Sequence, residues 1–476
     1  MAVGTYSAAS GFMNPGLIEM LSGGTWAATT GSASTTCSGA ANAPGAVSTQ
    51  QYQLTASDGV TWQPLDLTKL CLTLAPTRAE SILLMGNADL WTGVTGINQD
   101  LGIAVSADGS APQLVSWKES GGTAGTFSPN AAYVQWLYGL SPGHVYAVSL
   151  DWKTNRNESA GTIYAGAGPI NGAFSPTSLV AQPFPNGPPN FAAITTQPTL
   201  TNSDGATWQT LDPGLNTTLT PASTSTAILG VNADLWTSAT GYNQDIGIFV
   251  SDNGDPDQLV AWKESGGVAT FSPNAAFATA TYPMNAGHAY EFTVKWKTNV
   301  DTHGNGATIW AGAGPNGGPF SPTDLLAETV PVGSTPQSAA IVSQPQLTSS
   351  DGTTWQPMDP ALSLSVSAVA SAVALVGANA DLWTNTSGYN QDIGIFVSDN
   401  GGAAQLVAWK ESGGFAGTFS PNAAFVHTGY VFVPGHTYVF TAKWKTNRSA
   451  PGATVYAGAG PIASQFSPTR LTLEYL

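Results

Sequence analysis

The chain has 476 residues, of which 42% are hydrophobic, 10% aromatic and only 9% charged, and its formal net charge is −16. This supply of apolar and aromatic residues argues against intrinsic disorder. An acidic balance with no basic run excludes the electrostatic footprint of a nucleic-acid binder, so no nucleic-acid partner is expected. No stretch approaches 18 uninterrupted apolar residues, so membrane insertion is not expected either.

Residues 1–50 are predicted to form an N-terminal arm, because Ser, Thr, Ala and Gly dominate there and nothing in the segment repeats. Asn14 as N-cap, Pro15 at the first helical position and Gly23 as the stop predict a short helix. A helix this short is marginal in water and would have to dock on something, whereas a tethered, partly ordered arm is the alternative. The predicted docking residues are the apolar ones, Leu17, Ile18, Met20 and Leu21. Met1–Tyr6 does not read as a secretory signal.

The two cysteines, Cys37 and Cys71, lie outside the repeated part of the sequence and have no equivalents further along the chain. A fold that depended on a disulfide framework would repeat its cysteines with its domains. Free thiols are therefore expected rather than a bridge.

Seven sequence blocks occur three times each, at offsets of 144 to 148 residues. A period of this length is the size of a whole domain, so each repeat should own a core. Three tandem domains are predicted, at 51–183, 194–331 and 341–476, joined by proline-rich linkers. In the second repeat the blocks are Asn-Ala-Asp-Leu-Trp-Thr from Asn232, Asn-Gln-Asp from Asn243, Trp-Lys-Glu-Ser-Gly-Gly from Trp262, Phe-Ser-Pro-Asn from Phe271, Trp-Lys-Thr-Asn from Trp296, Ala-Gly-Ala-Gly-Pro from Ala311 and Phe-Ser-Pro-Thr from Phe320.

Within each repeat, short runs rich in Val, Ile, Phe, Tyr and Trp alternate with clusters of Gly, Pro, Asn, Asp and Ser, and helical periodicity is hard to find. Eight short strands per repeat predict an all-β fold, a two-sheet sandwich of jelly-roll type. In the third repeat the predicted strands are 354–358, 372–376, 393–397, 405–409, 424–426, 437–444, 453–456 and 471–475.

The order of features in each repeat resembles that of a known family. A Trp near the start, an apolar strand and a Gly-rich middle precede the turn Pro434-Gly-His-Thr-Tyr438, a long strand that ends at Trp444, and a final Leu-Thr-Leu strand from Leu471. This order is similar to the tumour-necrosis-factor/C1q-like jelly rolls that cap collagen-like fibres and bacteriophage tail or head fibres. The resemblance implies trimers around a three-fold axis, so an intramolecular pseudo-trimer is expected, with beads on a string as the alternative.

The repeated blocks are identical in all three repeats, whereas the sequence of the strand before them differs from repeat to repeat. Two explanations of this identity remain open. In the first, the Trp residues are core aromatics whose indole N–H needs a partner, and the Asn and Asp beside them tie loops. In the second, exposed Trp beside Asn, Gln, Asp, Lys and Glu forms a sugar site used three times. The candidate ligand-binding residues are Asp89, Trp91, Asn98, Asp100, Lys118, Glu119, Asp234, Trp236, Asn243, Gln244, Asp245, Lys263, Glu264, Asp381, Trp383, Asn390, Asp392, Lys410 and Glu411.

Signals for catalysis are weak. The sequence has no His-Glu-x-x-His, Gly-x-Ser-x-Gly or P-loop motif. Asp245 and Glu264 could serve as general acid and base only with a separation and a pKa split that sequence cannot show. The repeated histidines each sit alone in a Gly-His turn, so no metal is predicted. We expect no enzyme and no cofactor.

These observations lead to a non-enzymatic virion surface protein of a bacteriophage, a head decoration or tail-fibre protein. Its arm would dock on other virion structural proteins, its jelly rolls would face outward, and host-surface glycans are the candidate ligand. The rival is a secreted, multivalent lectin or cell-surface adhesin, in which three like sites would multiply avidity.

Overall fold

The computed structural model describes residues 37, 45–120, 129–184, 187–265, 273–304, 306–331, 337–412 and 421–475. All the secondary-structure elements in this part of the chain are β-strands, which confirms the all-β prediction. A search of the same residues for a helix that is long and apolar enough to cross a membrane finds none. The predicted helix near Asn14 and the docking residues Leu17, Ile18, Met20 and Leu21 lie outside the described residues.

Each repeat is a sandwich of two antiparallel sheets. In the first repeat, one sheet has the order β1-β11-β5-β10-β2 with β8 paired along β5, and the other has the order β3-β9-β6-β7 with β4 also paired to β9. We call the sheet that contains β8 the axial sheet. The strands are β1 (Gly45–Ser48), β2 (Tyr52–Thr55), β3 (Gln63–Pro64), β4 (Cys71–Leu74), β5 (Glu80–Thr92), β6 (Gln99–Ala107), β7 (Gln113–Ser120), β8 (Asn130–Leu140), β9 (Tyr146–Thr154), β10 (Thr162–Ala165) and β11 (Thr177–Pro183).

The second and third repeats have the same pairings in the same order. The second repeat has β12 (Asn190–Ile194), β13 (Thr199–Thr201), β14 (Gln209–Thr210), β15 (Asn216–Leu219), β16 (Ser225–Thr237), β17 (Gln244–Asp252), β18 (Gln258–Ser265), β19 (Asn274–Met284), β20 (Tyr290–Thr298), β21 (Thr308–Ala311) and β22 (Thr323–Pro331). The third has β23 (Gln337–Ile341), β24 (Gln346–Thr348), β25 (Gln356–Pro357), β26 (Ser363–Ser367), β27 (Ala372–Thr384), β28 (Gln391–Asp399), β29 (Gln405–Ser412), β30 (Asn422–Phe432), β31 (Thr437–Thr446), β32 (Thr454–Ala457) and β33 (Thr469–Tyr475).

The connectivity is that of a jelly roll, because the chain passes repeatedly between the two sheets as it goes from β4 to β11. All eight strands predicted in the third repeat are present, and β23, β24 and β26 are additional. The second predicted strand is much longer than expected, since β27 runs on through the Asn-Ala-Asp-Leu-Trp-Thr block to Thr384. The interpretation that Asn379 and Asp381 tie loops is therefore wrong, because both residues lie within a paired strand.

Two observations bear on the segment predicted as the arm. Strand β1 begins at Gly45 and pairs with β11, so the last residues of the predicted arm belong to the axial sheet of the first repeat. Cys37 forms a disulfide with Cys71 of β4, with the two Cα atoms 5.6 Å apart, a separation that suits a bridge. The expectation of free thiols is wrong, and the bridge ties this segment to the first sandwich. The domain boundaries themselves stay predictions.

The three sandwiches do not have independent cores. Each core cluster includes one alanine from another repeat: Ala275 joins the core of the first repeat, Ala423 that of the second and Ala131 that of the third. These alanines belong to the Ser-Pro-Asn-Ala-Ala segments, whose identity in all three repeats follows from this shared position. The direction of sharing is cyclic, so each sandwich is completed by the next one around a ring.

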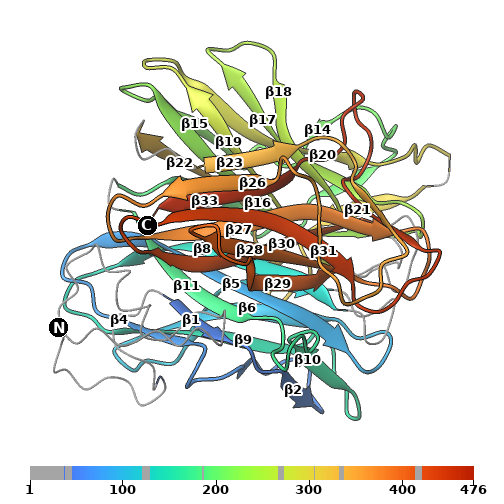
Figure 1. Ribbon diagram of the computed structural model, residues 1–476. Helices are drawn as coiled ribbons and strands as arrows, with labels where there is room; N and C mark the ends of the chain where they lie inside the picture. Colours follow the sequence, from blue (N-terminus) through green and yellow to red (C-terminus); the bar gives the residue numbers. More distant parts are fainter. Residues whose placement is uncertain are drawn as a thin grey trace.

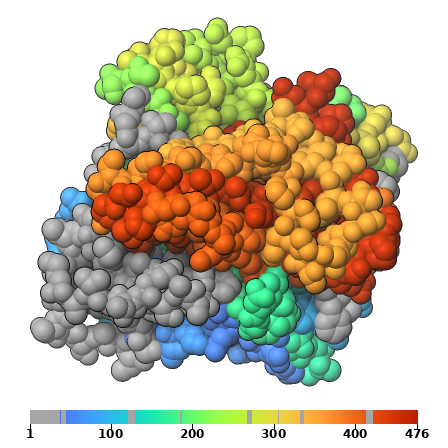
Figure 2. Space-filling model, in the orientation of Figure 1, coloured from blue at the N-terminus to red at the C-terminus, as the bar shows by residue number. Residues whose placement is uncertain are grey.

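The ring closes on a three-fold set of aromatic side chains. Tyr133 of β8, Phe277 of β19 and Phe425 of β30 lie in mutual contact, with ring centroids 4.6, 4.7 and 4.9 Å apart. Leu83, Met85, Val180 and Leu326 pack around them in one buried cluster. Figure 1 shows the three repeats around this centre, in blue to teal, green to yellow and orange to red, and Figure 2 shows the orange-to-red repeat packed against the other two. The expected intramolecular pseudo-trimer is confirmed.

Polar positions on the axis differ between the repeats. Gln182, Glu328 and Glu474 are equivalent by spacing, and Gln182 Nε2 donates to Glu474 Oε1 at 2.7 Å. Burial and the neighbouring Glu474 raise the pKa of Glu328 to about 9, so this carboxyl holds a proton at neutral pH and hydrogen-bonds its partner. A symmetric trimer of identical chains could not place one amide and two carboxyls at one level of its axis. Fusion of the repeats in one chain permits this unequal layer.

Candidate functional site

The Trp-Lys-Glu-Ser strand ends form the polar contact between neighbouring repeats. Lys118 Nζ of the first repeat donates to the carbonyl oxygen of Pro322 in the second, and the backbone N–H of Glu119 donates to Asp234 Oδ2 at 3.1 Å. The same two bonds recur at the other boundaries, so they run from repeat one to two, two to three and three back to one. The equivalent pairs are Lys263 with Pro468, Glu264 with Asp381, Lys410 with Pro176 and Glu411 with Asp89.

Each boundary buries a compact group of charged side chains. At the first, Lys153 forms an ion pair with Asp100, and Asn98 Nδ2 donates to Glu119 Oε1 at 2.6 Å. Desolvation raises the pKa of Glu119 well above its ordinary value, and the neighbouring Asp100 carboxyl raises it further. Desolvation also raises the pKa of Asp100, to about 6, against the opposing effect of Lys153.

Counting charges explains why a proton is retained. The group contains four carboxyls, on Asp100, Glu119, Asp234 and Asp324, but only two ammonium groups, on Lys118 and Lys153. With every group ionised the cluster would carry two net negative charges in a site with almost no solvent contact, which is costly. Protons on Glu119 and Asp324 make the cluster neutral, in agreement with the direction of the Glu119 pKa and with burial raising the pKa of Asp324 to about 7.

The Trp residue of each strand end packs on the Ala-Gly-Ala-Gly-Pro turn of the neighbouring repeat. Gly168 has φ +101°, and a Cβ atom placed on it would lie 2.9 Å from the ring of Trp409. The same approach occurs between Gly314 and Trp117 and between Gly460 and Trp262. Both blocks are therefore invariant for one reason, because each indole needs a neighbour without a side chain.

The other repeated Trp residues are fixed within their own repeats. Trp91 is half-buried, stacks on Tyr164 with the ring centroids 3.9 Å apart, and donates its indole N–H to the carbonyl oxygen of Gly166 at 3.0 Å. Trp236 stacks in the same way on Trp310, and Trp383 on Tyr456. Each indole is thus held by a stacking partner and by a hydrogen bond to a glycine carbonyl oxygen of its own repeat.

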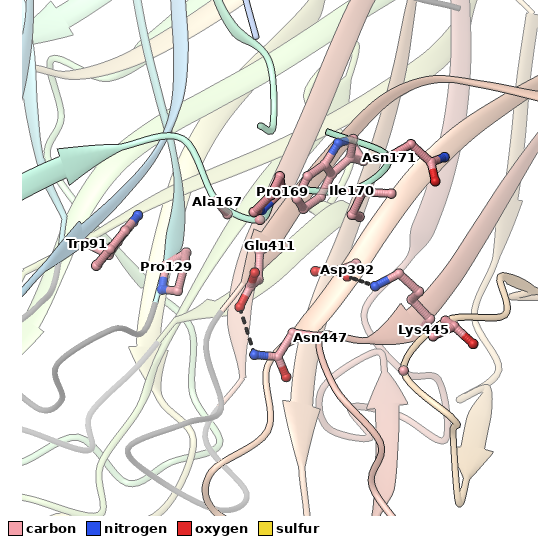
Figure 3. Close-up of a pocket in the computed structure, with 14 residues that line it drawn as sticks. Trp91, Pro129, Ala167, Pro169, Ile170, Asn171, Asp392, Glu411, Lys445 and Asn447 are labelled. Atoms are coloured by element: carbon pink, nitrogen blue, oxygen red, sulfur yellow. Dashed lines mark hydrogen bonds and ion pairs between the residues drawn. The ribbon is translucent and has the colours of Figure 1, made fainter. Parts of the chain in front are cut away.

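A pocket of about 560 Å³ opens at the boundary between the third and first repeats (Figure 3). The first repeat supplies an apolar wall, and the third supplies polar groups from β28, β29 and β31 and the segment after β31. The residues from the first repeat are Trp91, Pro129, Ala167, Gly168, Pro169, Ile170 and Asn171. Those from the third are Gly352, Thr353, Asp392, Trp409, Glu411, Lys445 and Asn447.

The structure brings most of the predicted ligand-binding residues together at the three boundaries, but it does not expose them. Apart from the half-buried Trp91, Trp236 and Trp383, all of them are buried, which corrects the expectation of an open surface. Of this set, Trp91, Asp392 and Glu411 line the described pocket. Their role in binding a ligand stays a prediction.

Several pocket residues were missing from the sequence-based set. Lys445 and Asn447 belong to the Trp-Lys-Thr-Asn block, and Pro169 to the Ala-Gly-Ala-Gly-Pro block. Their signal was present, because both blocks occur three times without change. A lone Lys or Pro has no chemistry that distinguishes it from a residue of a turn, so repetition alone does not mark these residues as ligand-binding.

Comparisons with known proteins add little. No family model matches the chain, and no curated protein matches it. Similar solved structures include the VP2 subviral particle of infectious bursal disease virus, at 10% identity over 98% of this chain and 88% of that one, with a TM-score of 0.22. The Gx strain of that virus matches at 9% over 91% and 81% (TM-score 0.20), and an insecticidal delta-endotoxin from Bacillus thuringiensis at 10% over 53% of each chain (TM-score 0.15). Likeness at these scores supports no argument about this chain.

A pair of glycine substitutions tests the contact between Trp409 and the Ala-Gly-Ala-Gly-Pro turn of the first repeat. Gly168→Ala should lower the free energy of unfolding by about 1–3 kcal/mol more than Gly172→Ala, because only the first Cβ meets a buried indole. Gly172 has φ +82° with no atom within 4 Å of an added Cβ, so it controls for backbone strain alone. Urea denaturation monitored by Trp fluorescence measures both. Equal losses would show that Trp409 does not pack there.

The buried carboxyls predict an unusual dependence of stability on pH. A carboxyl whose pKa is raised in the folded state stabilises the fold at low pH and loses that contribution as pH rises through the folded pKa. Asp100, Asp245 and Asp392 have folded pKa values of about 6 against an ordinary 3.8, so the melting temperature should fall as pH rises from about 4 to about 6. The three buried Glu residues should extend the fall above pH 6.

The triple variant Glu119→Gln, Glu264→Gln and Glu411→Gln separates the contribution of the buried Glu residues to the pH dependence of stability from that of the buried Asp residues. Glutamine stands in for the protonated acid, so the fall in melting temperature above pH 6 should shrink while the fall below it remains. Differential scanning calorimetry from pH 4 to 8 provides the profile. A melting temperature that rises steadily over this range would contradict the assigned protonation.

Proposed function

We propose that the chain is a non-enzymatic surface protein of a virus particle of bacteriophage type, a head decoration or tail-fibre protein. The observation that carries the proposal is the ring closed by Tyr133, Phe277 and Phe425, because it makes a trimeric jelly-roll unit from a single chain. Trimeric jelly rolls are what the resemblance to fibre-capping modules implies, and a fused trimer suits a position that needs one copy of the whole unit.

The surface of the molecule supports this proposal. Only 9% of the residues are charged, so the exterior is largely polar but uncharged. Among described residues, the exposed large apolar side chains are few and include Val60, Val300 and Val369. Val60 and Val300 belong to the first and second repeats, and the others, Val342, Val369, Val433 and Tyr475, belong to the third. A few exposed apolar side chains are normal for a surface that faces solvent. We propose that the N-terminal segment makes the attachment and that its apolar residues meet other virion structural proteins.

Catalysis is left out of the proposal because the best acid–base pair is committed to structure. Asp392 and Glu411 face each other across β28 and β29, yet Asp392 pairs with Lys445 and the backbone of Glu411 bonds Asp89 of the first repeat. The proposal instead includes recognition of host-surface glycans. A secreted, multivalent lectin or adhesin is the second candidate, favoured by the pocket at the boundary between repeats.

Substitution of the predicted docking residues tests the attachment. In the variant with Leu17, Ile18, Met20 and Leu21 replaced by Ser, the protein should melt as the parent does but should no longer join particles. Immunogold labelling and immunoblots of purified particles measure incorporation. The control is Val369→Ser, which removes an apolar residue that is 95% exposed on the third repeat and should leave incorporation unchanged. Absence of the parent protein from particles, or full incorporation of the quadruple variant, would contradict the proposal.

A further inference from the structure

We infer that the pocket between neighbouring repeats is a binding site for a neutral, polyhydroxylated ligand of the pyranose class, and that the chain carries three such sites. The inference deepens the glycan-binding part of the proposed function and does not depend on the kind of particle. It rests on the shape of the pocket, an unpartnered buried carboxylate, the charge balance of the walls and the recurrence of the same contacts.

The pocket has the size and construction of a ligand site. Its volume of about 560 Å³ lies in the range of small-molecule pockets, roughly 300–1,000 Å³. The first repeat contributes the apolar residues Trp91, Pro169 and Ile170, and the third contributes Asp392, Glu411 and polar neighbours (Figure 3). The two sides of the pocket belong to different repeats, so the site exists only in the closed ring.

An unsatisfied acceptor lies at this pocket. Asp392 is 1% exposed, and one of its oxygens pairs with Lys445. The other oxygen, Oδ1, has no hydrogen-bond partner among the described residues. In Figure 3 it is turned away from Lys445, toward the side on which Glu411 lies. A buried carboxylate oxygen without a donor is costly, and a ligand hydroxyl would supply that donor.

One donor, the carboxyl group of Glu411, lies beside this acceptor. Glu411 Oε1 accepts from Asn390 Nδ2 at 2.7 Å and from Asn447 Nδ2 at 3.2 Å. Because both amides bond Oε1, the proton that the buried carboxyl retains belongs on Oε2. An O–H donor next to a free acceptor suits a hydroxyl group, which donates and accepts at once.

The charge balance selects a neutral ligand. Lys445 is paired with Asp392, Lys410 lies near Asp89, and Glu411 holds a proton, so the pocket has no charge left over for an ionic group. A bound anion or cation would lose its hydration without gaining a counter-ion. The rigid indole of Trp91, held by its stack on Tyr164, and the ring of Pro169 offer apolar surface to the C–H face of a sugar ring.

The same floor recurs at the other two boundaries. Oδ1 of Asp100 and of Asp245 is also unpartnered among the described residues, and each boundary has the same Lys–Asp pair and Asn–Glu bond. The rim differs, because the position of Thr353 is Val60 in the first repeat and Ala206 in the second. Three sites of one ligand class with unequal rims are therefore expected, which suits multivalent capture of repeating surface glycans.

Rim substitutions test the site without disturbing its buried floor. Thr353, Val60 and Ala206 are exposed, so Val60→Trp, Ala206→Trp and Thr353→Trp each place a large ring at the mouth of one pocket. Saturation-transfer difference NMR with the methyl glycosides of glucose, galactose and mannose, added to the intact chain, reports binding. We expect transfer from the parent protein to at least one of these glycosides, a reduced signal with each single variant and loss of transfer with the triple variant. Val369→Trp is the matched control outside the pockets and should keep the parent signal.

Three results would overturn the inference: no transfer to any neutral glycoside, undiminished transfer in the triple variant, or transfer only to the charged sugars N-acetylneuraminic acid and glucosamine. The readout is separate from that of the particle experiment. If the protein is incorporated into particles but binds no glycoside, the proposed binding site is contradicted and the proposed virion function is not. If the protein binds a glycoside but is absent from particles, the virion function is contradicted, the binding site is supported, and the secreted lectin is favoured.

Discussion

The strand end Trp-Lys-Glu-Ser of each repeat, set into the neighbouring repeat, is the contact on which the arrangement depends. It joins a Lys ammonium to a backbone carbonyl, a Glu backbone N–H to a buried Asp and a Trp ring to a glycine turn, as in Lys410, Glu411 and Trp409 against the first repeat. Because the same contact is made three times in one direction, each of the three described repeats is matched by a neighbour on both faces. Closure in this way hides equivalent surfaces without a second subunit.

Burying this contact has an electrostatic consequence. At the boundary between the third and first repeats, the carboxyls of Asp89, Asp392 and Glu411 share two ammonium groups, so the folded state is neutral there only if Glu411 keeps a proton. The first boundary adds the buried Asp324, and the second adds the guanidinium of Arg470. A proton is also retained at the three-fold axis, where the three equivalent residues differ: Glu328 and Glu474 share a proton beside Gln182. A buried group of this kind contributes specificity more readily than stability, and here it would discriminate the correct neighbour from a shifted one.

Much of the fold could be predicted from sequence, because alternating apolar residues and Gly or Pro turns mark short strands, and the repeat period marks the domains. What could not be predicted was the direction in which identical residues face. Asp381 looked like a loop or site residue, yet it lies in the middle of β27, fully buried, and accepts from the neighbouring repeat. Period-two alternation fails there, because this strand is covered on both sides, on one by its own sandwich and on the other by the second repeat. Invariance of Asn-Ala-Asp-Leu-Trp-Thr signalled a constraint without saying that a second repeat imposes it.

Small-angle X-ray scattering of the monomeric protein tests the closed ring most directly. A compact chain of 476 residues should have a radius of gyration near ~23 Å by the scaling for single compact bodies, and its distance distribution should show one globular maximum. Beads on proline-stiffened linkers would instead scatter as an elongated rod, with a radius of gyration well above that value and a maximum length near three domains end to end. The compact result is what the shared cores and the Tyr133–Phe277–Phe425 contact predict, and the rod would contradict them.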